Sequence, residues 1–168
     1  YLDESKGYID AVYSDVGKYF NVLPKAALEV RRVEAWREQS APIAFYNQPA
    51  PDGSRPGIYY VNLRDMSTRQ RHGIETVAYH EGAPGHHFQL AIQYELKFAF
   101  FGAYAEGWGL YAERLAKEQG RFTDPLHDFG RLQDEMLRAA RLVVDTGAHA
   151  KRWTREQMID YMLANSPM

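Results

Sequence analysis

A proline–glycine pair stands inside the chain's most histidine-rich stretch and rules out one continuous helix there. Residues 79–89 read YHEGAPGHHFQ and hold three of the six histidines. Pro84 cannot donate a backbone hydrogen bond and clashes with the preceding turn, while Gly85 adopts backbone angles that other residues avoid. The apolar flanks ETVAY and FQLAI favour helix on both sides. The sequence therefore predicts two helices that meet at a sharp break.

The same stretch is close to the zinc-protease motif H-E-x-x-H, in which two histidines grip one ion and the glutamate activates water. His86 follows His80 by six positions, which on an unbroken helix places it roughly 9 Å further along the axis. A break at Pro84 would fold the next turn back, so we expect His86 to act as the second histidine. His87 would then point elsewhere, toward substrate, although it is also an alternative second ligand. A turn that merely carries surface histidines is the simpler interpretation.

A glutamate in a later segment is the candidate for the third ligand. Zinc proteases of the thermolysin type take this ligand from a later helix, and AYAEGWGLYAERL supplies Glu106 among apolar and aromatic residues. A carboxylate in such surroundings needs a partner, because charges are rarely buried alone. That partner is a metal ion in one interpretation and an arginine, Arg114 or Arg138, in the other.

The composition limits the classes of protein to which the chain can belong. Its 168 residues, 45% of them hydrophobic, suffice for one domain with a core. There is no cysteine, so any metal must be held by nitrogen and oxygen. The net charge of −2 without a basic run argues against nucleic-acid partners, and no apolar run approaches the length of a membrane span. The chain begins at Tyr1 without a methionine, and we expect a fragment of a larger protein.

A small sheet precedes the helical part in this prediction. Apolar residues at helical spacing predict an N-terminal helix over about 1–22. Residues 43–46 and 58–61 are rich in β-branched and aromatic side chains and flank a turn-forming loop, so they are predicted to be paired strands. Residues 29–33 are a further short strand. We therefore expect a small antiparallel β-sheet within residues 23–64.

Residues 65–168 are predicted to be helical and to carry the metal site. Ser67 or Thr68 can cap a helix that leads into the histidine motif. Asp124, followed by proline, starts a long helix, and a capping box at Thr154 starts the last one. The expected fold class is mainly α with the small sheet ahead of it.

Four ordered motifs resemble one bacterial family. They are DGSRPGIYYVNL, HEGAPGHHFQ, EGWGLYAERL and RLVVDTGAHAKRW. Together they are similar to the "domain of unknown function 885" family, whose H-E-x-x-P-G-H-H signature resembles that of zincin-type zinc peptidases. The resemblance covers the chain from about residue 23 onward. It implies a single zincin-like catalytic region over residues 1–168, with His80, His86 and Glu106 as metal ligands.

The same resemblance implies that the chain is a piece of a larger helical protein. Family members are several times longer, with a helical N-terminal part and a further C-terminal segment. The stretch from Gln93 to Tyr104 is also shorter than in the family. A periplasmic or secreted location is favoured over a cytoplasmic one.

These parts predict a zinc-dependent hydrolase that acts on peptides or small amides. Zinc on two histidines and a glutamate leaves a position for water, and Glu81 beside His80 is placed to act as general base. The oxyanion of the transition state needs a donor across the cleft. Arg141, Asp145 and His149 share one helical face, so His149 could donate to the oxyanion and Arg141 could bind a substrate carboxylate. A structural Arg141–Asp145 pair with a capping His149 is equally open.

Tyrosines and one strand complete the predicted substrate site. Tyr104 and Tyr111 are possible hydrogen-bond donors in the segment that carries the third ligand. The strand over residues 57–63 could hold an extended peptide by β-augmentation, with Tyr60 in contact with substrate. In the other interpretation, Ile58 and Tyr60 simply pack one face of the sheet.

Two other classes compete with the hydrolase. One is a helical metal-binding or scaffold protein without catalysis, in which Glu81 would have no role. The other is a di-iron or di-manganese oxidase, which needs Glu-x-x-His pairs. None of the residues three positions before a histidine is glutamate, so the sequence argues against the oxidase.

Overall fold

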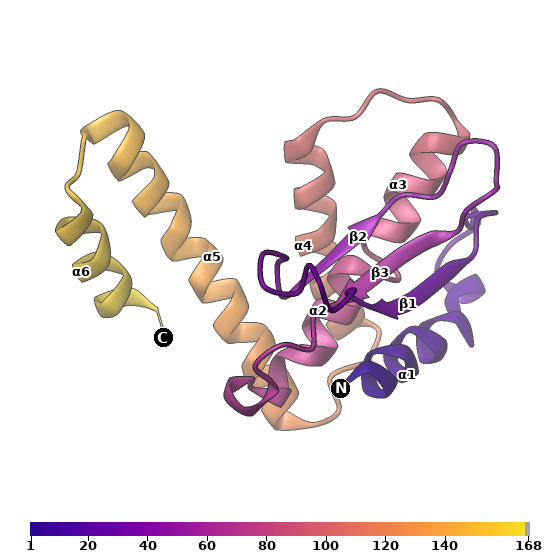
Figure 1. The fold of residues 1–168 in the computed structure, drawn as a ribbon, viewed down its shortest axis with the longest axis horizontal. Helices are drawn as coiled ribbons and strands as arrows, with labels where there is room; N and C mark the ends of the chain where they lie inside the picture. Colours follow the sequence, from indigo (N-terminus) through magenta and orange to yellow (C-terminus); the bar gives the residue numbers. More distant parts are fainter. Residues whose placement is uncertain (167–168) are drawn as a thin grey trace.

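The computed structural model describes residues 1–166, which form six α-helices and a three-stranded sheet (Figure 1). The mainly helical class is confirmed. The helices are α1 (Leu2–Tyr13), α2 (Ile74–Glu81), α3 (His86–Glu95), α4 (Gly102–Glu118), α5 (Pro125–Lys151) and α6 (Arg155–Asn165). The strands are β1 (Leu28–Arg32), β2 (Ala44–Asn47) and β3 (Gly57–Val61), and the short 3-10 helices are η1 (Val16–Lys18), η2 (Met66–Thr68) and η3 (Arg71–Gly73). Within this described part, none of the helices combines the length and the apolar character that crossing a membrane requires.

The sheet is mixed, which corrects the predicted antiparallel sheet. Its strand order is β1-β3-β2, with β3 antiparallel to β2 and parallel to β1. Residues 33–43 connect β1 to β2 and cover one face of the sheet, where Val33 and Ala41 pack with Ile58 and Tyr60. This connection carries the chain to the opposite edge, so β3 enters between the two earlier strands and runs parallel to β1.

The other face of β3 belongs to the main core. Tyr59 and Val61 are at most 1% exposed and pack with residues of α1, α2 and α3. Side chains alternate between the two faces of a strand, so β3 serves both clusters at once. The helix that carries the first motif histidine, α2, is thereby fixed against the sheet.

The first helix is shorter than predicted. α1 ends at Tyr13 rather than near residue 22, because Asp15 takes a non-helical conformation with φ −138° and ψ 4°. The chain resumes as η1, and Val16 is still buried at 4% exposure. The apolar spacing therefore marked buried positions at Ile9, Val12 and Val16, although it did not mark one continuous helix.

The helix of the histidine motif starts later than predicted. Ser67 and Thr68 lie in η2 and do not cap α2, which begins at Ile74. Between them the backbone of Arg69 and Gln70 is extended, so a helix cannot run through. α2 is consequently only 8 residues long, and most of its residues are buried.

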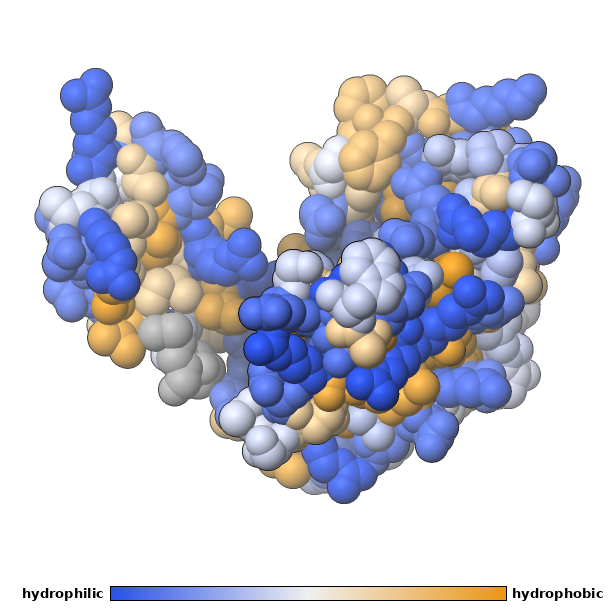
Figure 2. All heavy atoms as spheres, viewed as in Figure 1, coloured by the Kyte–Doolittle hydropathy of each residue, from blue (hydrophilic) through white to orange (hydrophobic). Residues whose placement is uncertain are grey.

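α5 and α6 form a helical hairpin that leaves the body of the molecule (Figure 1). Asp124 caps α5 by accepting from the N–H of Leu126 at 2.8 Å, and the predicted capping box of Thr154 starts α6. Near its start α5 packs on η3, where a Cβ at Gly130 would lie 2.4 Å from a backbone oxygen of η3. We call residues 139–166 the arm. Figure 2 shows an open hollow between the arm and the body.

Candidate metal centre

The break between α2 and α3 folds the chain back on itself. α2 ends at Glu81 and α3 begins at His86. Gly85 approaches α2 so closely that a Cβ there would lie 2.0 Å from the carbonyl oxygen of His80, and only glycine fits such a contact. The His80 and His86 rings consequently lie 4.7 Å apart between centroids. The structure thus brings the two histidines together across the break.

Glu106 of α4 completes a group of three possible metal ligands. Its Oε2 lies 3.7 Å from Nε2 of His80 and 3.8 Å from Nε2 of His86. One ligand atom from each residue lies within 4.8 Å of the other two. The side chains of His80 and His86 are 15% and 9% exposed, whereas that of Glu106 is 70% exposed. The group is therefore open to solvent on the side of Glu106.

Close packing sets the position of α4 relative to the motif. A Cβ at Gly109 would lie 2.7 Å from Cε1 of the His80 ring, closer than real Cβ atoms approach. The indole nitrogen of Trp108 donates to the carbonyl of Pro84 at 2.9 Å, which ties α4 to the loop between the two histidines. Glu106 is therefore carried by a helix that contacts both the first histidine and the break.

Behind the group, a buried carboxylate holds the first histidine. Nδ1 of His80 lies 2.7 Å from Oε1 of Glu113, a residue that is 3% exposed. The other oxygen of Glu113 accepts from Arg138 of α5. The sequence interpretation considered Arg138 as a partner for Glu106 and overlooked Glu113. A signal was present, because seven positions are about two helical turns and place Glu113 on the same side of α4 as Glu106.

Burial and neighbouring charged groups set the pKa values of the two histidines. Burial and the neighbouring His80 lower the pKa of His86 to about 4, so its ring is neutral at pH 7 and offers a lone pair. Burial by itself lowers the pKa of His80, but the Glu113 carboxylate raises it, and the net shift is upward. Neutral imidazole nitrogens and carboxylate oxygens are the donors that zinc accepts in proteins without cysteine ligands.

Glu81 directly follows His80 and stays outside the group of three. Burial raises the pKa of its carboxyl to about 7, against a smaller lowering by His80 and with a smaller rise from Glu106. The backbone N–H of Tyr46 on β2 faces this carboxyl. A partly buried carboxyl that is close to the candidate ligands but free of them is suited to proton transfer.

His87 points away from the group into the core, and its contact with substrate stays a prediction. Its ring is 0% exposed, and its Nδ1 lies 2.9 Å from the hydroxyl of Tyr46. A Cβ at Gly57 of β3 would lie 2.6 Å from that nitrogen. Successive residues of a helix point about 100° apart, so His87 enters the core while His86 faces the group. Burial lowers the pKa of His87 to about 4, and the neutral ring links α3 to β2.

The free edge of the sheet near the group belongs to β2, not to the predicted strand at residues 57–63. β3 is paired on both sides, with β1 and with β2, so it has no edge to offer. Tyr60 is 7% exposed, stacks on Phe45 with ring centroids 5.0 Å apart, and lies under Arg37. The ring is packed beneath the connection from β1 to β2, and its substrate contact stays a prediction.

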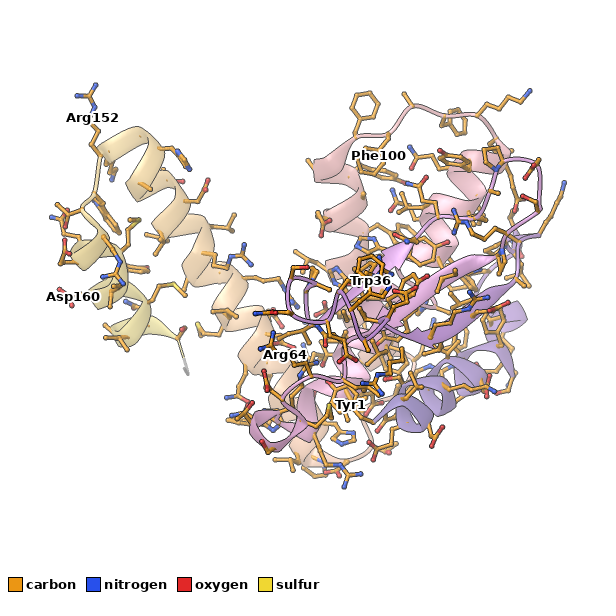
Figure 3. All side chains as sticks on the ribbon, viewed as in Figure 1. Tyr1, Trp36, Arg64, Phe100, Arg152 and Asp160 are labelled. Carbon is orange, nitrogen blue, oxygen red and sulfur yellow. The ribbon has the colours of Figure 1, made fainter. Side chains whose placement is uncertain are left out.

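The arm carries the predicted transition-state donors away from the group. His149 is 81% exposed and lies 3.5 Å from Asp145 on the same helix. Arg141 is exposed as well. Figure 3 shows Arg152, just beyond the end of α5, at the tip of the arm far from the body. These residues share one face as predicted, but α5 does not bend back toward the body. The structure does not bring these residues to the group, and the roles of His149 and Arg141 stay predictions.

Tyr104 and Tyr111 project from α4, the helix of Glu106. They are 58% and 49% exposed. Tyr104 also lines an apolar pocket of about 600 Å³ between α3 and α4. Their contact with substrate stays a prediction.

Comparison with known proteins places the chain beside one family. The family model described as "Bacterial protein of unknown function (DUF885)" matches residues 1–168. No curated protein matches the chain. A crystal structure described as that of "the putative lipoprotein from Colwellia psychrerythraea" is similar, with a TM-score of 0.91 and 46% sequence identity. The match covers 96% of this chain and 29% of that one, so the chain spans less than a third of its solved relative.

Proposed function

The chain belongs to the DUF885 family of bacterial proteins of unknown function, and we propose that it carries the active site of a zinc-dependent peptidase. The observation that supports this best is the meeting of His80, His86 and Glu106, with one ligand atom from each within 4.8 Å of the others. The fold is consistent with the proposal, because a sheet with a free edge lies beside the helix of the first histidine, as in zincin-type peptidases.

The donor atoms fit a zinc ion. Hydrolytic zinc sites use three protein ligands, often two histidines and a glutamate, and leave a fourth position open. Here two imidazole nitrogens and one carboxylate oxygen converge, and the solvent-exposed side of Glu106 gives access to substrate. Zinc held in this way supplies a Lewis acid that lowers the pKa of a bound water molecule toward 7.

Glu81 is the residue to which we assign proton transfer. It neighbours the candidate ligand His80 without joining the ligand group, and it lies near the backbone of Tyr46 on β2. In peptide hydrolysis the attacking water gives one proton to the Glu81 carboxylate. As the C–N bond breaks, Glu81 passes this proton to the nitrogen of the leaving amine.

We place an extended peptide substrate along the outer edge of β2. The N–H of Asn62 donates to the carbonyl of Ile43 at 2.9 Å. Hydrogen-bonded positions alternate along an antiparallel pair, so the backbone groups of Ala44 and Tyr46 point outward. The outward N–H of Tyr46 faces Glu81. A peptide that paired with this edge would therefore pass the proposed base.

We also propose an extracytoplasmic location. The support is the solved relative, which is described as a lipoprotein and covers nearly the whole chain at 46% identity. Peptides or small amides in that compartment would be the substrates. The competing function is a non-catalytic helical metal-binding or scaffold protein, which would use the same three ligands but would not need Glu81.

The test uses the full-length protein with and without Glu81→Gln. We expect about one zinc per chain in both proteins by elemental analysis, and hydrolysis of a mixed peptide library by the unchanged protein. Glu81→Gln keeps the shape of the side chain and removes the proton acceptor, so turnover should fall by about a hundredfold or more. Glu118→Gln, an exposed change on α4, is the control. Zinc binding without any hydrolysis supports the scaffold function instead, and absence of zinc contradicts both.

A further inference from the structure

Two buried glutamate–histidine pairs in the chain have nearly the same geometry and different surroundings. Glu75 lies 2.8 Å from Nδ1 of His127, and Glu113 lies 2.7 Å from Nδ1 of His80. Both glutamates are at most 5% exposed. Only the second pair includes a candidate metal ligand. The first pair therefore shows what such a contact does for the fold alone and serves as an internal reference.

The atoms of the second pair determine where the proton of His80 resides. Glu113 uses its other oxygen to accept from the guanidinium of Arg138, and a carboxylate can only accept hydrogen bonds. Nδ1 of His80 must then donate. In a neutral ring this leaves the lone pair on Nε2, the atom that faces Glu106 at 3.7 Å. The contact thus selects the tautomer that can bind a metal in the group of three.

The second histidine has no such support among the described residues. Nδ1 of His86 is buried without a hydrogen-bond partner within residues 1–166. Its ring meets His80 edge to face, at an interplanar angle of 85°. Packing alone orients His86, whereas His80 is held by a directed, charge-assisted contact of the strong kind. The ring of His80 is therefore oriented more firmly than that of His86.

We propose that Glu113 is a positioning residue, which fixes the tautomer and the orientation of His80, and that Arg138 of α5 holds Glu113 in place. The part of this inference that concerns the metal rests on the proposed function. Removing the hydrogen-bond partner of a metal-binding histidine commonly lowers metal affinity about ten- to a hundredfold. The helix α5, which offers no ligand to the group, would thereby belong to the metal site.

The first measurement does not require metal. Long-range ¹H–¹⁵N NMR correlations of the metal-free full-length protein report which ring nitrogen carries the proton. We expect His80 to carry it on Nδ1, and Glu113→Gln to give a mixture of tautomers, because an amide can accept or donate. The control Glu75→Gln should leave the His80 signals unchanged. A neutral His80 ring in the unchanged protein with its proton on Nε2 and none on Nδ1 overturns the proposal, whatever the protein binds.

The second measurement is zinc affinity, by competition with a chelator. Glu113→Gln should weaken binding about ten- to a hundredfold, and Arg138→Met should weaken it less, since Glu113 remains. Arg138→Lys should recover part of that loss. Arg131→Met is the matched control, because Arg131 is 6% exposed on the same helix and pairs with Asp128 and Glu135 away from the group.

The two measurements separate the inference from the proposed function. Equal zinc affinity in Glu113→Gln and the unchanged protein overturns the positioning role while the metal site stands. If the unchanged protein binds no zinc, the proposed function fails and the tautomer of His80 still decides the role of Glu113. If Glu113→Gln does not fold, the weaker zinc binding expected in Arg138→Met and its partial recovery in Arg138→Lys test the same contact.

Discussion

The helices α2–α4, which carry the candidate ligands, and the arm each contain a contact between a histidine and a carboxylate, in different settings. His80 and Glu113 come from two helices, lie 2.7 Å apart, and have side chains that are 15% and 5% exposed. His149 and Asp145 come from one helix, lie 3.5 Å apart, and are 81% and 77% exposed. The first contact joins separate elements out of water, while an exposed pair of the second kind contributes about 0–1 kcal/mol. The residue types are similar, and packing between separate elements makes the difference.

The apolar residues of the two regions differ in the same way. In α3, Phe88 is 1% exposed and belongs to the main core. In the outer half of α5, Leu142 is 73% exposed. The apolar face of a helix becomes buried only where another element packs against it. The local sequence of the arm therefore specifies a helix but does not by itself specify a site.

The largest expected effect is on metal binding when a histidine of each region is removed. His86→Ala deletes a proposed ligand, so zinc affinity should fall by more than about a hundredfold, the upper cost of losing an outer partner. His149→Ala should leave zinc affinity unchanged. Isothermal titration of zinc into both variants makes the comparison. A comparable loss in His149→Ala would mean that the arm reaches the group in solution.

A smaller but clear effect is expected at the break. A Cβ at Gly85 would lie 2.0 Å from the His80 oxygen and 2.2 Å from the Tyr79 oxygen, so Gly85→Ala must push α3 away from α2. We expect zinc affinity to fall between about ten- and a hundredfold, as for other changes in ligand placement. Gly102→Ala, where nothing lies within 4 Å of the added atom, is the control. Unchanged affinity in Gly85→Ala would mean that the close return of the chain is not part of the site.

Two glycines of α4 sharpen the role of packing around His80. Gly109→Ala places an atom 2.7 Å from the His80 ring, while at Gly107 the same change meets nothing within 4 Å. We expect Gly109→Ala to weaken zinc binding about tenfold. Gly107→Ala should keep the affinity and stabilise the helix by up to about 1 kcal/mol. Thermal unfolding and zinc titration of both variants give the result, and equal affinities would show that His80 yields without loss of the site.

The smallest effect is expected on the arm. Leu142→Ser exchanges an exposed apolar side chain for a polar one, so the free energy of unfolding should change by at most about 0.5 kcal/mol. Chemical denaturation of the full-length protein measures it. A loss of several kcal/mol would show that another part of the protein covers this face of α5.

Local signals in the sequence were sufficient for most of the helical part. Asp124 with its proline and the Thr154 capping box marked the starts of α5 and α6, because capping depends on neighbouring residues only. The break at Gly85 was predictable for the same reason. The order of strands was not, since the course of residues 33–43 over the sheet depends on contacts far apart in the chain.

In the candidate site, too, local features could be predicted from the sequence, whereas contacts between separate elements could not. His80, His86 and Glu106 could be named from a motif, and the structure brings them together. His87 could not be assigned correctly, because its direction depends on how α3 meets Tyr46 of β2. Glu113 was missed since its partner Arg138 lies 25 positions away on another helix. Spacing within one helix is visible in a sequence, whereas pairing between helices is not.

One consequence follows from the continuity of α5. A straight helix of 27 residues is about 40 Å long at 1.5 Å per residue. Its inner part packs on η3, and Arg138 donates a hydrogen bond to Glu113. Its outer end extends away from the body (Figure 1). Arg138 lies at the middle of this helix, so α5 connects its free outer end to the residue that holds Glu113. A displacement of the outer end would be transmitted through Arg138 and Glu113 to His80, the first candidate ligand.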